Sequence, residues 1–177
     1  MSKLKAKNNF SFLSILFVFV AIGFMAWVRL RASMTELWLD EVMSLEIARR
    51  VKFLSDVLLQ RIDNNHLLNT VFLVLLGDGK PDWLYRLPST LCSMLMLVAA
   101  YRIGYAQSAL MKCKPVHRRL GGWVLIILLG FSYPVVLLGT EARGYSILML
   151  SCLGAWWSIV RFFESKNPKW ALAYGFF

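Results

Sequence analysis

Long apolar runs alternate with short charged segments along this chain. The first run, 10–28, contains no charged residue and approaches the roughly 20 residues that a helix needs to cross a bilayer. Further runs cover 83–105, 120–138 and 146–163, and another apolar segment begins at Trp170. The pattern predicts an all-α integral membrane protein, a polytopic helical bundle of about four spans plus the start of a fifth.

The segment 29–82, between the first two runs, is predicted to be an outer loop with structure of its own, because unstructured connections of this length are uncommon. Two amphipathic helices at the membrane surface are expected in it. The first opens at the adjacent acids Asp40 and Glu41. Its apolar residues recur at helical spacing, at Ile47, Val51, Leu54 and Leu58. The second covers the apolar run 66–77, which is too short to cross a bilayer.

The composition agrees with a bilayer protein, because 58% of the residues are hydrophobic whereas soluble domains are nearer about 45–50%. The net charge of +10 could suggest a nucleic-acid partner. The basic residues are scattered between apolar runs and form no continuous stripe, so nucleic-acid binding is excluded.

The distribution of Lys and Arg predicts the orientation of the chain. With the N-terminus in the cytoplasm, eleven basic residues lie on the cytoplasmic side with one acid, Glu164, whereas nine basic residues on the outer side are matched by nine acids. Short cytoplasmic loops are generally rich in Lys and Arg. The first run is also longer than the apolar core of a signal peptide, so we interpret it as an uncleaved anchor.

Polar residues gather on the predicted outer side, and they are the candidate site. Asp40 and Glu41 follow the first span, His66 begins the second surface helix, Arg86 lies at the start of the second span, and 139–145 joins the third and fourth spans. Carboxylates, a histidine and arginines at one interface are typical of a functional site.

Each of these residues also has a structural interpretation. The acid pair could be an ordinary helix start, where carboxylates are favoured by the helix dipole. Arg86 could reach lipid headgroups, His66 could cap a helix, and Glu141 could pair with Arg143.

The order of four segments carries a family resemblance. After the first apolar span come "LWLDEVMSLEIARR", "DNNHLLNTVFLVLLG", "WLYRLPSTL" and "GTEARGYSILML". This order resembles the N-terminal part of membrane glycosyltransferases with the GT-C fold, the RgtA/B/C/D-like group related to protein O-mannosyltransferases and aminoarabinose transferases. The resemblance covers essentially the whole chain, 1–177.

The resemblance implies roles for six residues. Asp40 matches the acid that acts as general base on the acceptor, and Glu41 matches its neighbour, so both are expected to be catalytic. His66 stands where relatives carry His-Pro-Pro, and here two leucines replace the prolines. A substrate-binding role is implied for His66 and for three further residues, Arg86, Glu141 and Arg143.

The implied activity is the transfer of a sugar from a polyprenyl phosphate to a hydroxyl of a glycan, lipid or protein, in the cell envelope at the outer (periplasmic or extracellular) face of a bacterial inner membrane. The residue types suit this chemistry. A carboxylate beside Trp38 and Leu39 could have a raised pKa and serve as a base. Arginines such as Arg86 and Arg143 suit a phosphate leaving group.

No cofactor and no metal motif are predicted, although Asp40, His66 and Glu141 could together hold a divalent ion. Enzymes of this type have about twice as many spans, so the chain is expected to be a truncated frame or fragment that is inactive alone. Two further hypotheses stay open. One is a non-catalytic membrane partner or degenerate enzyme half, and the other is a transporter fragment, which the nearly uncharged spans disfavour.

Overall fold

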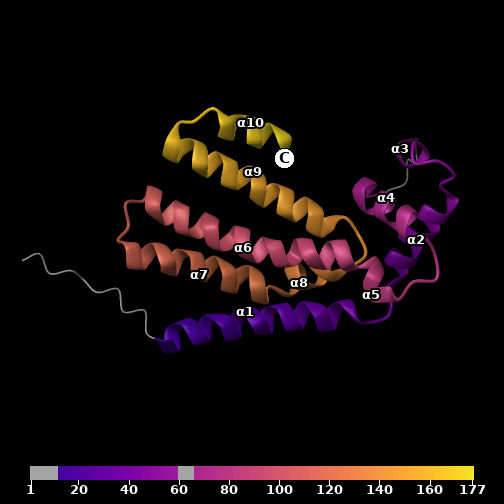
Figure 1. The fold of residues 1–177 in the computed structure, drawn as a ribbon, viewed down its shortest axis with the longest axis horizontal. Helices are drawn as coiled ribbons and strands as arrows, with labels where there is room; N and C mark the ends of the chain where they lie inside the picture. Colours follow the sequence, from indigo (N-terminus) through magenta and orange to yellow (C-terminus); the bar gives the residue numbers. More distant parts are fainter. Residues whose placement is uncertain (1–11, 60–65) are drawn as a thin grey trace, which may run out of the picture.

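The computed structural model describes residues 12–59 and 66–177, and within these residues it contains helices and no strand (Figure 1). The helices are α1 (Phe12–Ser33), α2 (Leu39–Arg50), α3 (Asp56–Leu59), α4 (Leu67–Leu76), α5 (Asp82–Tyr85), α6 (Leu87–Leu110), α7 (Pro115–Phe131), α8 (Tyr133–Thr140), α9 (Tyr145–Ser165) and α10 (Lys169–Phe176). The all-α class predicted from the sequence is therefore confirmed for the described part of the chain.

The long helices form a bundle around α6, which packs against α7, α8 and α9 (Figure 1). α1 packs against α8 and α6, and α10 folds back against α9. The short helices α2 to α5 gather at one end of the bundle (Figure 1). The polar residues of the long connection after α1 are thereby concentrated at that end.

Two described helices, α6 and α9, are long and apolar enough to cross a membrane, and the bent pair α7 and α8 could supply a third crossing. Helices of this length and hydropathy indicate a membrane protein. The first predicted span, 10–28, begins outside the described residues, and four spans remain a prediction.

The third predicted span, 120–138, is divided rather than continuous. α7 and α8 meet at Ser132 with a bend of 64°. Pro134 lies in the first turn of α8, where its nitrogen cannot donate the hydrogen bond that would continue α7, and the backbone of Ser132 is extended, with φ −65° and ψ 113°. The bend leaves carbonyls at the end of α7 without helical partners.

The buried side chain of Arg29 binds two of those carbonyls. Its Nη1 donates to Gly130 O at 3.1 Å and its Nη2 to Leu129 O at 3.3 Å, while Nε donates to Ser93 Oγ at 2.8 Å. The sequence prediction placed Arg29 in the outer loop. That boundary was wrong, because α1 continues to Ser33 and carries Arg29 into the bundle.

Glycines allow α6 and α7 to approach closely. A side-chain carbon added to Gly104 would collide with the backbone of Gly121 and come within 3.0 Å of the Cα atom of Gly122. Small residues at such crossings let two membrane helices pack through their backbones.

The first surface helix is shorter than its periodicity predicted. α2 ends at Arg50, and the helical spacing does not continue through Leu58. The carboxylate of Asp56 accepts a hydrogen bond from Phe53 N at 3.0 Å, which favours a new helix start at α3. The second predicted helix of this segment is present as α4, which ends at Gly77 with a positive φ of 72°, and its place at the membrane surface stays a prediction.

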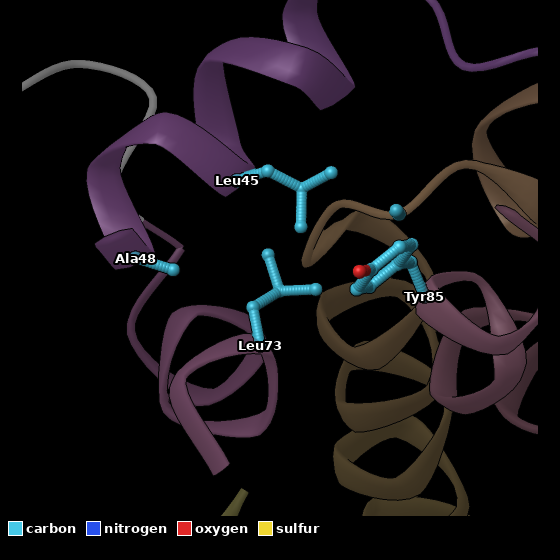
Figure 2. Close-up of a cluster of buried hydrophobic side chains, with 5 residues drawn as sticks. Leu45, Ala48, Leu73 and Tyr85 are labelled. Atoms are coloured by element: carbon cyan, nitrogen blue, oxygen red, sulfur yellow. The ribbon is translucent and has the colours of Figure 1, made fainter. Parts of the chain in front are cut away.

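A small apolar cluster holds the short helices together (Figure 2). Leu45 and Ala48 of α2 point toward Leu73 of α4 and Tyr85 of α5, and Ala142 from the connection between α8 and α9 completes the cluster. Since apolar burial stabilises by about 25 cal/mol per Å2, these contacts fix α2 and α4 against the end of the bundle.

Candidate functional site

A buried ion pair joins the start of α2 to the start of α6. Arg86 donates from Nε to Glu41 Oε1 at 2.7 Å and from Nη2 to Glu41 Oε2 at 2.5 Å, and the two side chains are 1% and 0% exposed. The remaining donors of Arg86 bind backbone carbonyls at the end of α1 and just after it, those of Ser33, Thr35 and Glu36. Bidentate hydrogen bonding of this kind is the strongest form of arginine–carboxylate pairing.

The carboxylate of Glu41 has two further hydrogen bonds. Trp38 N donates to Oε2 at 2.8 Å, and Ala142 N donates to Oε1 at 2.5 Å. Each oxygen therefore accepts two hydrogen bonds. Both Glu41 and Arg86 are occupied by protein groups, so their geometry fits positioning of the surrounding backbone better than contact with a substrate.

The connection 141–144 is held by three helices. Glu41 of α2 accepts from Ala142 N, Asn69 of α4 donates to Ala142 O at 2.8 Å, and Ser89 of α6 donates to Arg143 O at 2.8 Å. The backbone that carries Glu141 and Arg143 is therefore fixed from several sides.

Asp40 is the exposed carboxylate of the site, and it pairs with Arg143, whose side chain is largely buried. Arg143 Nη1 lies 3.0 Å from Asp40 Oδ2, and the Asp40 side chain is 56% exposed. The guanidinium also lies 3.8 Å from Glu141 Oε2 and 4.6 Å from the centre of the Tyr145 ring. Asp40 faces the solvent, whereas its neighbour Glu41 faces inward.

Glu141 lies in the same cluster and is largely buried. Burial raises the pKa of its carboxyl above the ordinary 4.5, the cation of Arg143 opposes this rise in pKa, and the nearby acids Glu41 and Asp40 add to it. A carboxyl in such a setting holds its proton to higher pH than a solvated one.

His66 precedes α4 and packs against the connection. Its ring contacts the Tyr145 ring edge-on, with centroids 4.7 Å apart, and a side chain at Gly144 would collide with it. Burial lowers the pKa of the imidazole, and the positive charge of Arg143 lowers that pKa further. His66 is therefore neutral at neutral pH. The "DNN" residues before it lie outside the described part of the chain.

Several polar atoms of the cluster are buried without a hydrogen-bond partner among the described residues. They are His66 Nε2, Asn69 Oδ1, Glu141 Oε2 and Ser146 Oγ. A buried polar group left unpaired costs about 1–3 kcal/mol, so such atoms generally mark a place where water or a polar ligand binds.

Sequence reasoning missed three contributors to this end of the bundle, Asn69, Ser89 and Tyr145. Asn69 carried a signal, because an amide in the middle of the apolar run 66–77 needs a partner when buried. Ser89 carried none, since serine is common near helix starts, and Tyr145 was included only as the last residue of the segment 139–145.

Within residues 12–59 and 66–177, no group of three His, Cys, Asp or Glu side chains lies close enough to hold a metal ion. Asp40 and Glu141 each lie close to Arg143, and His66 contacts Tyr145. The three side chains therefore do not surround a common point at which a metal ion could bind.

The six candidate residues thus come from four separate parts of the sequence and meet at one end of the bundle. They divide into a buried pair, Glu41 with Arg86, and a more accessible group, Asp40 with Arg143, Glu141 and His66. Comparison of the chain with models of protein families, with curated proteins and with solved structures finds no match.

Proposed function

We propose that this chain forms the acid- and arginine-bearing part of a GT-C-like membrane glycosyltransferase, which transfers a sugar from a polyprenyl phosphate to an acceptor hydroxyl at the outer membrane face. The observation that carries the proposal is the pairing of Asp40 with Arg143 at 3.0 Å. A base and a phosphate-binding cation lie side by side there, at the end of a helical bundle.

The chemistry assigned to this pair is one displacement. The acceptor hydroxyl gives its proton to the Asp40 carboxylate while its oxygen bonds to the anomeric carbon of the sugar. The bond between that carbon and the phosphate oxygen breaks, and the electron pair leaves with the polyprenyl phosphate. Arg143 stabilises the negative charge of the departing phosphate.

The resting ion pair fits this sequence of events. A phosphate bound to Arg143 competes with Asp40 for the guanidinium, and the carboxylate is then free to accept a hydrogen bond from the acceptor. Glu141 and neutral His66 supply further polar contacts to the substrates, and Glu41 with Arg86 positions the backbone around them.

Substitution of Asp40 by Asn tests the proposal. The change is made in the gene at its natural locus, and membranes are supplied with a panel of labelled polyprenyl-phosphate sugars. Loss of a general base is expected to lower turnover by about 10²- to 10⁴-fold. Arg143→Lys keeps the charge but loses the planar fork, and it is also expected to lower turnover.

The matched control is Glu46→Gln. Glu46 is an exposed acid on the same helix, 3.5 Å from Arg49 and Arg50, and it is remote from the pair. Full turnover by Asp40→Asn, with the same protein level as the control, contradicts the proposal and favours the non-catalytic partner.

A further inference from the structure

A second feature lies between the long helices, away from the polar cluster. It is an apolar groove of about 760 Å3, within the roughly 300–1,000 Å3 typical of ligand pockets. Its walls come from α1, α6, α7 and α9, and they include Ile22, Ala26, Leu97, Tyr101, Trp123 and Trp157. Ile22 and Val98 are exposed, so the groove opens on the outer surface of the bundle.

The groove extends along α6 from Met94, before the middle of the helix, to Tyr105 in the half that lies away from Asp40. Arg102, which lines it, is fifteen residues beyond the start of α6, or about 22 Å along the helix axis. The hydrocarbon core of a bilayer is about 30 Å thick. The end of the groove that holds Arg102 therefore lies in the leaflet on the side of the connection between α6 and α7.

Arg102 is the one charged residue that lines the groove, and no carboxylate in the described part of the chain pairs with it. Arg102 is exposed on the surface of the bundle, where a charge within the bilayer is costly unless it has a partner or reaches the headgroups. The nearby connection adds positive charge through Lys112 and Lys114, and the start of α7 adds Arg118. The acid Glu164 at this end already pairs with Arg161.

We propose that the groove binds an anionic phospholipid of this leaflet, which is the cytoplasmic leaflet in the predicted topology. The headgroup phosphate pairs with the guanidinium of Arg102, and an acyl chain lies along the aromatic wall of Tyr101, Trp123 and Trp157. The surplus of basic groups favours a lipid with a net negative charge over a zwitterionic one.

Native mass spectrometry of the purified chain in detergent tests this binding. The chain is mixed with phosphatidylglycerol or with phosphatidylcholine. Retention of phosphatidylglycerol and loss of phosphatidylcholine are expected. Arg102→Gln is expected to lower phosphatidylglycerol binding about tenfold, by analogy with the loss of one charge-assisted contact. Lys52→Gln removes one positive charge at the opposite end of the bundle, where Lys52 is exposed and does not line the groove, and it should bind as the unaltered chain does.

A steric variant tests the acyl-chain position separately. Ala26→Phe fills the groove, and Gly23→Phe places the same ring on α1 where nothing lies within 4 Å of an added carbon. Ala26→Phe should lose phosphatidylglycerol and Gly23→Phe should keep it. If gel filtration shows that Ala26→Phe does not fold, the binding of phosphatidylglycerol by Arg102→Gln, compared with the unaltered chain, tests the proposal instead.

Three results would overturn the proposal. They are equal binding of the two lipids, unchanged binding by Arg102→Gln, and unchanged binding by a folded Ala26→Phe. None of these measurements depends on sugar transfer, so they test the lipid site independently of the proposed function.

Discussion

At the scale of single residues, two adjacent acids occupy opposite environments. Asp40 is exposed and contacts Arg143, whereas Glu41 is buried and binds Arg86. Successive residues of a helix point about 100° apart, so both cannot face the same way. The sequence predicted that this pair marks the site. It could not predict which acid faces inward, because that depends on Ala142, which is 101 residues away from Glu41.

Glu41→Ala is expected to destabilise the fold by about 3–5 kcal/mol, because it leaves the charge of Arg86 buried and uncompensated. Unfolding of the purified chain by denaturing detergent measures this loss. Asp40→Ala, next to it but exposed, should cost much less. Equal losses for the two variants would contradict the assigned difference in burial.

Glu141 gives a pH-dependent prediction. Its pKa in the fold is raised above 4.5, so the fold is favoured while the carboxyl is protonated, and this contribution is lost as the pH rises through the folded pKa. Glu141→Gln removes that loss. The melting temperature of the variant minus that of the unaltered chain should therefore increase between about pH 4 and about pH 7. A constant difference would contradict the raised pKa.

At the scale of helices, the apolar runs predicted α4, α6 and α9 because length and hydropathy fix such elements locally. The breaks were harder to predict. α7 and α8 separate at Ser132, where the freed carbonyls meet Arg29 from a distant helix. α2 stops before Val51 although apolar spacing continues, since capping by Asp56 favours a new start.

The crossing of α6 with α7 is expected to tolerate no side chain at Gly104. Gly104→Ala would push against the backbone of Gly121 and should destabilise the fold by about 1–3 kcal/mol. Gly23→Ala on α1 meets nothing within 4 Å, and it should be neutral or stabilise by up to about 1 kcal/mol. Thermal unfolding of the two variants compares them, and similar melting temperatures would contradict the close crossing.

At the scale of the whole molecule, the two ends of the bundle differ in chemistry. The candidate site and the short helices occupy one end, and the basic connection 111–114 occupies the other (Figure 1). Which end faces the cytoplasm follows from the distribution of Lys and Arg and stays a prediction.

Labelling with a membrane-impermeant thiol reagent tests this orientation. With Cys92 and Cys152 replaced by alanine, Cys113 should react only from the cytoplasmic side. In a cysteine-free chain, Asp78→Cys at the opposite end of α6 should react only from the outer side. Reaction of both from one side would show that α6 does not cross the membrane.

The buried carboxylate of Glu41 also constrains how the protein is made. Its partners Arg86 and Ala142 follow it by 45 and 101 residues, so a ribosome adding about 5–20 residues per second supplies them roughly 2–9 s and 5–20 s later. Until then the carboxylate must stay hydrated, because burial of an unpaired charge is costly, and α2 cannot pack against the bundle. The contacts of the candidate site are therefore completed only after α8 and the connection that follows it have been synthesised.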